Sequence, residues 1–199
     1  MPRLTYFITH PDVVVDPLLP VARWPLSERG RLRLRNMLAQ PWVTEIGAIF
    51  CSGERKAMDG AAILAEHCRL PFQAVPELGE NDRTSTGYLE ATEFQETADR
   101  FFAQPTERIR GWERAVDAQA RIARTVFALA DSTPVAAPIA VIAHGTVGAL
   151  LLCHVRGAPI SRSAEQPGRN GGHYFVFQYP PARLVRGWSP IDALSVDQG

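Results

Sequence analysis

Two short apolar runs in this chain, residues 4–9 and 139–143, each end at a histidine, His10 and His144. A short continuous apolar run of this kind is typical of a strand that is buried on both faces of a parallel sheet. In open α/β sheets, ligands bind beyond the carboxyl ends of the strands. The sequence therefore predicts a parallel sheet that brings two imidazoles, far apart along the chain, to one edge.

Strands and helices are predicted to alternate along the rest of the chain. Three further strands are expected, at residues 46–51, 174–178 and 183–186. Ser27 has the character of a helix N-cap, so a helix is expected to begin after it. Four further helices are expected, at residues 54–67, 91–103, 112–130 and 146–156. Two glycine-bearing polar segments are expected to be loops, residues 71–90 and 161–172.

This alternation predicts an α/β fold, a three-layer α/β/α sandwich with a mostly parallel central sheet. A chain of 199 residues is long enough to bury a substantial core. We expect a single domain that covers residues 1–199.

Composition excludes several classes of protein. Twenty-one basic residues balance twenty-one acidic ones, so net charge indicates no attraction to nucleic acid or to a membrane surface. No apolar run approaches the roughly 20 residues that span a bilayer. The cysteines form no CxxC pair, which argues against a zinc ribbon. We therefore expect reduced thiols at Cys51, Cys68 and Cys153 in a cytoplasmic protein.

Residues that suit a phosphoryl group follow two of the predicted strands. His144 precedes Gly145 at a predicted helix start, where free backbone N–H groups favour an anion. Arg55 falls in the first turn of the helix after strand 46–51, and a guanidinium can hold two phosphate oxygens at once. A cationic arginine would be repelled by a divalent metal, and no HxxxH or HxH spacing is present. The pattern predicts a phosphoryl site without a metal or other cofactor.

Four ordered motifs run through the chain. They read T-H-P at residues 9–11, P-L-S-E-R-G at 25–30, C-S-G-E-R-K-A-M-D-G-A at 51–61 and A-H-G-T-V-G-A-L-L at 143–151. The set resembles the histidine phosphatase superfamily, the phosphoglycerate mutase-like proteins. The patterns of that family are R-H-G, P-L-T-x-x-G, S-S-x-x-x-R-A-x-x-T-A and S-H-G-G-V. The resemblance implies a phosphoglycerate mutase-like fold.

The resemblance also implies a role for each candidate residue. His10 would be the nucleophile that becomes phosphorylated on a ring nitrogen. Arg55 would bind the phosphoryl group, and His144 would donate a hydrogen bond to a non-bridging oxygen. Residues 78–80 read L-G-E, like the family's L-x-E, so Glu80 is the expected acid for the leaving oxygen. Two nearby carboxylates are alternatives, Glu77 and Asp82.

The first motif departs from the family pattern on both sides of the histidine. Thr9 replaces the arginine and Pro11 replaces the glycine. A threonine hydroxyl can still contact phosphate, but losing a charged donor could cost ~3–4 kcal/mol of transition-state stabilisation. We expect another arginine from an edge loop to supply the missing charge, namely Arg23, Arg83 or Arg162.

The sequence thus predicts a phosphatase that acts on a small phosphorylated substrate through a phosphohistidine on His10. An alternative is a non-catalytic protein that binds a phosphorylated ligand or phosphate ion, which the altered first motif favours. A phosphoglycerate-type mutase is a lesser alternative, because no insertion is available to keep water from the phosphoenzyme. Substrate choice is expected to depend on loops 11–26, 77–90 and 161–173.

Overall fold

A six-stranded mixed sheet forms the centre of the protein. The computed structural model describes residues 2–134 and 136–193. The strands within these residues run in the order β3-β2-β4-β1-β5-β6. Their bounds are β1 (Arg3–Thr9), β2 (Ala48–Cys51), β3 (Phe72–Ala74), β4 (Ile139–Ala143), β5 (His173–Tyr179) and β6 (Arg183–Pro190).

The four strands β3, β2, β4 and β1 are parallel, and β5 and β6 continue the sheet in the antiparallel sense. In the central pair, Thr9 of β1 stands opposite Ala143 of β4. The carboxyl ends of β1 and β4 therefore lie side by side, and the mostly parallel sheet that the sequence predicts is confirmed.

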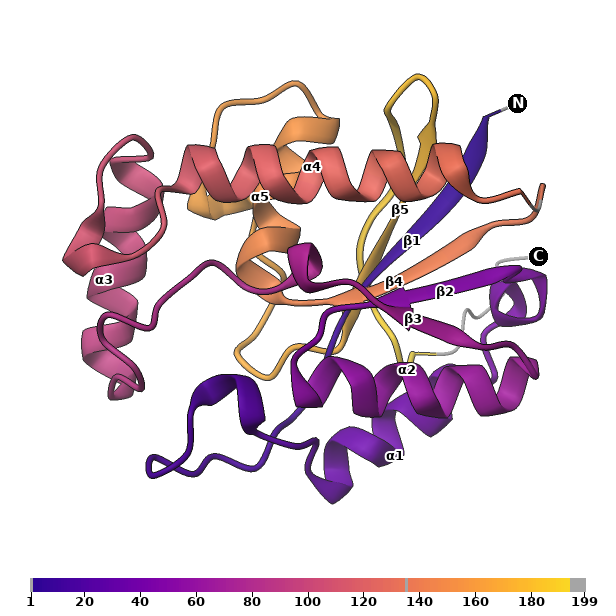
Figure 1. Cartoon of the computed structure of the whole chain (residues 1–199), viewed down its shortest axis with the longest axis horizontal. Helices are drawn as coiled ribbons and strands as arrows, with labels where there is room; N and C mark the ends of the chain where they lie inside the picture. Colours follow the sequence, from indigo (N-terminus) through magenta and orange to yellow (C-terminus); the bar gives the residue numbers. More distant parts are fainter. Residues whose placement is uncertain (1, 135, 194–199) are drawn as a thin grey trace.

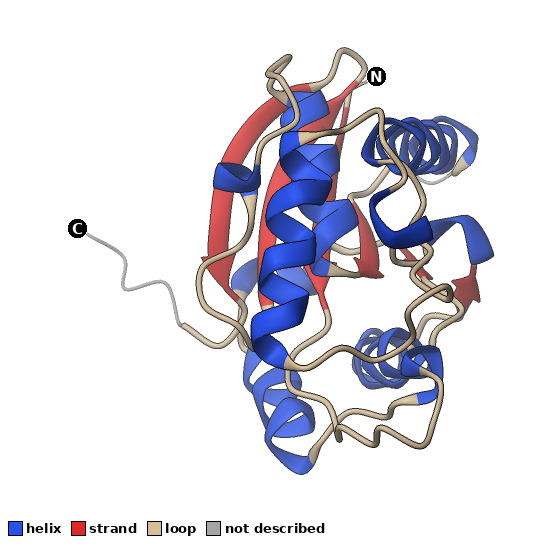
Figure 2. Cartoon of the chain, turned by 90° about the vertical axis from the view of Figure 1, so that its left-hand side faces the viewer, coloured by secondary structure: helices blue, strands red, loops and turns tan. Residues whose placement is uncertain are grey.

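Helices cover both faces of the sheet. Helices α1 and α2 lie on one side and α4 and α5 on the other, while α3 lies beyond the carboxyl edge (Figures 1 and 2). Their bounds are α1 (Glu28–Met37), α2 (Arg55–Cys68), α3 (Ala91–Ala103), α4 (Ala115–Ser132) and α5 (Gly145–Val155). The expected cap of α1 is present, since the Ser27 side chain accepts a hydrogen bond from the Gly30 N–H at 3.1 Å.

Strand β4 shows why two cores form. All of its five residues are buried, and successive side chains point to opposite faces of the sheet. Ile139 and Val141 pack with α4 and α5, whereas Ala140 and Ile142 pack with α1 and α2. The continuous apolar run of β4 is thus the consequence of burial on both faces.

Short elements differ from the sequence-based expectation. The segment expected as loop 71–90 contains the edge strand β3 and a 3-10 turn at Pro76–Leu78. All three residues of β3 are exposed, so no apolar pattern marks them. Strand β6 extends to Pro190, beyond the expected residue 186. Among the described helices, none has the length and apolarity to cross a membrane.

Candidate active site

The two strand-end histidines meet at the carboxyl edge of the sheet. The backbone N–H of His10 donates to the Ala143 carbonyl at 3.1 Å, which extends the β1–β4 ladder by one residue. The ring centroids of His10 and His144 lie 5.2 Å apart, with the planes inclined by 68°. The meeting of the two imidazoles that the sequence predicts is therefore present.

His10 has the ring orientation that a nitrogen nucleophile needs. Its Nδ1 lies 3.0 Å from the carbonyl oxygen of Pro11, which can only accept, so Nδ1 carries the proton. The other nitrogen, Nε2, then keeps its lone pair. Burial, followed by the charge of Lys56, lowers the pKa of His10 to about 4. The imidazole is consequently neutral near pH 7.

His144 is fully buried at the N-terminus of helix α5. Neither ring nitrogen has a hydrogen-bond partner among the described residues. Its Nε2 lies 3.3 Å from Oε1 of Glu54, in ion-pair range but outside hydrogen-bond geometry. Burial lowers the pKa of His144, and the Glu54 carboxylate opposes that shift. A buried imidazole without hydrogen bonds costs free energy, so a ligand that forms hydrogen bonds with the ring would be favoured.

Glu80 holds the N-terminus of helix α5 beside His144. Its carboxylate accepts hydrogen bonds from the backbone N–H groups of Thr146 at 3.2 Å and Val147 at 3.0 Å. It also accepts from the N–H of Asn81 at 3.1 Å, and an Arg83 nitrogen lies 3.8 Å away. These contacts fix the Glu80 carboxylate near His144, on which its charge acts.

The alternative carboxylates lie elsewhere. Glu77 is exposed. Asp82 is also exposed, and its side chain accepts from the backbone N–H of Thr84 at 2.9 Å and from its hydroxyl at 2.7 Å. Of the three acids considered from the sequence, the structure brings Glu80 to the histidines.

The cation of the third motif is Lys56, and not the expected Arg55. The Arg55 side chain is 57% exposed and its Nε donates to Asp59 at 2.8 Å. Lys56 is only 3% exposed. Its Nζ donates to the Val21 carbonyl at 2.9 Å and contacts the Glu54 carboxylate. The structure thus turns Arg55 toward solvent on α2, whereas the charge of Lys56 acts on His10.

The sequence contained the signal for Lys56. In the family pattern S-S-x-x-x-R-A, the cation directly precedes the alanine. Ala57 supplies that alanine, so the position of the cation is Lys56. Glu54 carried no comparable signal, since an acid at the start of a helix is ordinary on a surface.

Thr9 is not available as a phosphate ligand. It is fully buried, and its hydroxyl donates to Oε1 of Gln166 at 2.6 Å and accepts from the N–H of His173 at 3.0 Å. In the structure the Thr9 hydroxyl is therefore taken up by Gln166 and by strand β5. Gly145 lies beneath the same Gln166, whose Nε2 would stand 2.7 Å from a Cβ added there.

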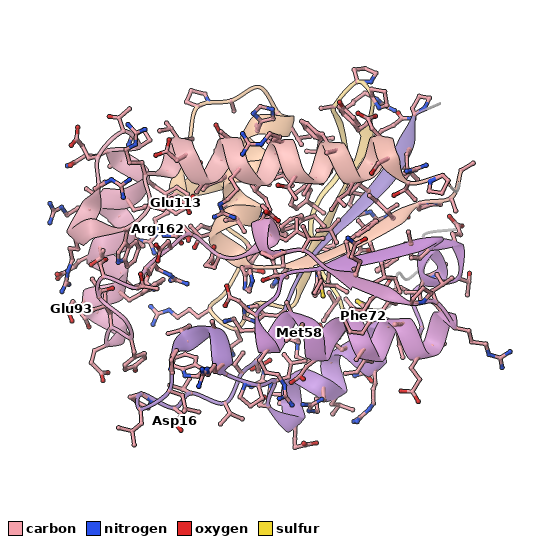
Figure 3. The ribbon with its side chains drawn as sticks, in the orientation of Figure 1. Asp16, Met58, Phe72, Glu93, Glu113 and Arg162 are labelled. Atoms are coloured by element: carbon pink, nitrogen blue, oxygen red, sulfur yellow. The ribbon has the colours of Figure 1, made fainter. Side chains whose placement is uncertain are left out.

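The three arginines proposed as replacements lie in different places. The charge of Arg83 acts on His10, and its guanidinium lies 5.1 Å from the ring centre of Phe94. Arg162 instead pairs with Asp99 of α3 and with Glu165, and Figure 3 shows Arg162 on the α3 side of the molecule. Arg23 is exposed in a 3-10 turn. Of the three arginines, Arg83 is the one whose charge acts on His10.

The family model of the histidine phosphatase superfamily, branch 1, matches residues 22–183. The chain belongs to the histidine phosphatase superfamily. The match begins after residues 9–11, so it covers His144 and Glu80 but not the altered first motif. No curated protein matches the sequence at a significant level.

Solved structures share the fold. A mycobacterial glucosyl-3-phosphoglycerate phosphatase with inorganic phosphate has a TM-score of 0.78 at 20% identity, covering 96% of this chain and 99% of that one. YhfR of Bacillus stearothermophilus has a TM-score of 0.76 at 19% identity, covering 94% and 96%. A putative α-ribazole-5′-P phosphatase of Escherichia coli has a TM-score of 0.70 at 18% identity, covering 98% and 99%.

The charges at the site suit an anion. The charges of Lys56 and Arg83 act on His10, and the buried imidazole of His144 lies against the His10 ring. Within the described residues, no group of three or more His, Cys, Asp and Glu side chains could hold a metal ion. The arrangement can therefore bind a phosphoryl group through cations and N–H donors.

Proposed function

We propose that this protein hydrolyses a small phosphomonoester through a phosphohistidine on His10. The observation that carries the proposal is the hydrogen bond from Nδ1 of His10 to the Pro11 carbonyl, 3.0 Å long. It keeps Nε2 unprotonated, as nucleophilic attack on phosphorus requires.

The first half of the reaction transfers the phosphoryl group to His10. Lys56, Arg83 and His144 bind the non-bridging oxygens and stabilise the charge that develops on them. Nε2 of His10 forms a bond to phosphorus as the bond from phosphorus to the leaving oxygen breaks. Protonated Glu80 gives its proton to that oxygen, and the free alcohol departs.

The second half of the reaction returns the enzyme to its starting state. The Glu80 carboxylate, held at the start of α5 beside His144 by the N–H groups of Thr146 and Val147, takes a proton from a water molecule. That water attacks phosphorus, the bond to Nε2 of His10 breaks, and inorganic phosphate forms. Glu80 is then protonated again and ready for the next leaving group.

The structural relatives support a small phosphorylated metabolite as the substrate. Two of them are described as phosphatases of glucosyl-3-phosphoglycerate and of α-ribazole 5′-phosphate. Both names describe a phosphate ester on a hydroxylated carbon skeleton. We therefore place the substrate in the class of small phosphate monoesters, with inorganic phosphate as the product.

Hydrolysis of p-nitrophenyl phosphate in the presence of a metal chelator tests the proposal. We expect turnover by the natural protein, an acid-labile phosphoenzyme after rapid quenching, and loss of both in His10→Ala. His67→Asn is the matched control, because His67 is exposed on α2 and should leave activity unchanged. Activity that survives in His10→Ala would refute the mechanism.

One observation favours a second function, the binding of a phosphorylated ligand without turnover. Thr9 is buried and bonded to Gln166 and His173, so the residue before the nucleophile gives no donor to a phosphoryl group. Calorimetric binding of phosphate by the natural protein, together with no turnover and no phosphoenzyme, is the outcome that this function predicts.

A further inference from the structure

The carboxylate of Glu54 occupies the site among the groups that a phosphoryl anion needs. Its Oε1 lies 3.3 Å from Nε2 of His144 and accepts a hydrogen bond from the backbone N–H of Glu80 at 3.0 Å. Its Oε2 contacts Nζ of Lys56. The Glu54 side chain is only 17% exposed, so the carboxylate lies largely within the protein.

This carboxylate is ionised. Burial on its own raises the pKa of Glu54, but the neighbouring His144 and Lys56 outweigh burial and hold the pKa below its usual range. A negative charge therefore stands beside the two groups, Lys56 and His144, that the proposed reaction assigns to the phosphoryl oxygens. Two anions a few ångströms apart repel each other strongly in a partly buried site.

We propose that Glu54 is a built-in competitor for the phosphoryl group: its carboxylate holds Lys56 and His144 in the free protein and turns away when substrate binds. The inference rests on the proposed function, because it concerns the same anion site. It adds a residue that sets substrate affinity, and that residue takes no part in bond making.

The local backbone allows the carboxylate to leave. Glu54 stands at the N-cap position of α2 with an extended backbone, and its side chain makes no capping hydrogen bond that would fix it there. A Cβ added to the preceding Gly53 would meet nothing within 4 Å, so open space adjoins this turn. Rotation of the Glu54 side chain toward that space would release Lys56 and His144 to the phosphoryl group.

Glu54→Gln tests the inference directly. Glutamine has nearly the same shape but carries no charge, and its single amide oxygen can keep only one of the two hydrogen bonds, that from Lys56 or that from the Glu80 N–H. We expect the dissociation constant of inorganic phosphate to fall by about tenfold, as a nearby negative charge is removed from a partly screened site. Loss of packing or of fold would instead weaken binding.

Isothermal titration calorimetry with inorganic phosphate, at fixed ionic strength, gives the measurement. Glu66→Gln is the matched control, because Glu66 is an exposed acid on the same helix and should leave binding unchanged. Unchanged or weaker phosphate binding by Glu54→Gln overturns the inference, as does a failure of both proteins to bind phosphate.

A second variant covers the case in which Glu54→Gln fails to fold, as judged by circular dichroism. Glu54→Asp keeps the negative charge but withdraws the carboxylate from both Lys56 and His144 by one methylene. We expect the dissociation constant of inorganic phosphate to fall, by less than about tenfold, because the charge remains but stands further away. Unchanged or weaker binding by a folded Glu54→Asp overturns the inference in that case.

The two proposals fail separately. Phosphate binding needs no transfer to His10. If the protein shows no turnover but its Glu54→Gln variant binds phosphate more tightly, the inference about Glu54 stands and the phosphatase proposal fails. If His10→Ala abolishes turnover but Glu54→Gln binds phosphate as the natural protein does, the phosphatase proposal stands and the inference about Glu54 fails.

Discussion

Arg55 and Lys56 are consecutive residues at the start of helix α2, yet their side chains enter opposite environments. Arg55 is 57% exposed at its side chain and pairs with Asp59, whereas Lys56 is 3% exposed and contacts Glu54 beside the two histidines. The charge of Lys56 lowers the pKa of His10. We therefore propose that the buried lysine, and not the arginine before it, belongs to the anion site.

Lys56→Met is expected to lower kcat/KM for p-nitrophenyl phosphate by about 10²–10³-fold, the usual effect of removing one donor to a developing oxyanion. The thermal stability of the variant should be recorded in parallel, because Lys56 also donates to the Val21 carbonyl. Steady-state kinetics on the folded variant give the result.

Arg55→Met provides the control one residue away. Because the Arg55 side chain is exposed and bound to Asp59, kcat/KM is expected to stay within about twofold of the natural value, as for most surface substitutions. A large loss in Arg55→Met combined with a small loss in Lys56→Met would reverse the assignment of the phosphoryl-binding cation.

The fold could be predicted from the sequence wherever burial leaves a periodic pattern. The run at 139–143 became β4 because both of its faces are buried, and Ser27 became the cap of α1. Strand β3 was missed because three exposed residues at a sheet edge carry no apolar signal. The antiparallel addition of β5 and β6 depends on pairing between distant segments, which local pattern does not specify.

The site could be predicted only where a strand end fixes the direction of a residue. His10 and His144 follow paired strands, so the register of β1 and β4 brings them together. Helix positions are harder, because a shift of one residue turns a side chain by about 100° around the axis. That shift separates Lys56 from Arg55. The role of Glu54 depends on its contacts with Lys56 and His144, which the sequence does not show.

Glu80→Gln should affect substrates according to their leaving group. An alkyl phosphate such as glycerol phosphate needs a proton on its leaving oxygen, so its kcat/KM is expected to fall by about 10²–10⁴-fold. p-Nitrophenolate leaves without a proton, so kcat/KM for p-nitrophenyl phosphate should fall by less than tenfold on the same reasoning. Both values come from steady-state kinetics with the two substrates.

Glu77→Gln is the matched control, because Glu77 is an exposed acid three residues before Glu80. It should leave both substrates unaffected. An equal loss for the two substrates in Glu80→Gln would indicate that Glu80 acts only by holding the start of α5, through its bonds to Thr146 and Val147.

The protonation of His10 should follow its lowered pKa. Burial and the charge of Lys56 bring that pKa to about 4, so His10 gains its proton only as pH falls through this value. The neutral nucleophile is thus present above pH ~4 and lost below it. NMR titration of the His10 ring should give a midpoint near 4, well below the ordinary value of 6.5.

Lys56→Met should move the same midpoint upward, because the positive charge that opposes a proton on His10 is removed. Arg55→Met should leave it unchanged. An ordinary midpoint near 6.5 in the natural protein would contradict the buried environment of His10.

Thr9→Val separates a structural role for Thr9 from a phosphate-binding role. Valine keeps the shape but leaves Oε1 of Gln166 and the N–H of His173 without the Thr9 hydroxyl. We expect the free energy of unfolding in urea to fall by about 1–3 kcal/mol, the usual cost of an unsatisfied buried polar group. Thr9→Ser, which keeps the hydroxyl, should retain most of the hydrogen-bond contribution.

Phosphate affinity should stay the same in folded Thr9→Val, since the hydroxyl that is lost faces strand β5. Weakened phosphate binding with unchanged stability would instead return Thr9 to the anion site.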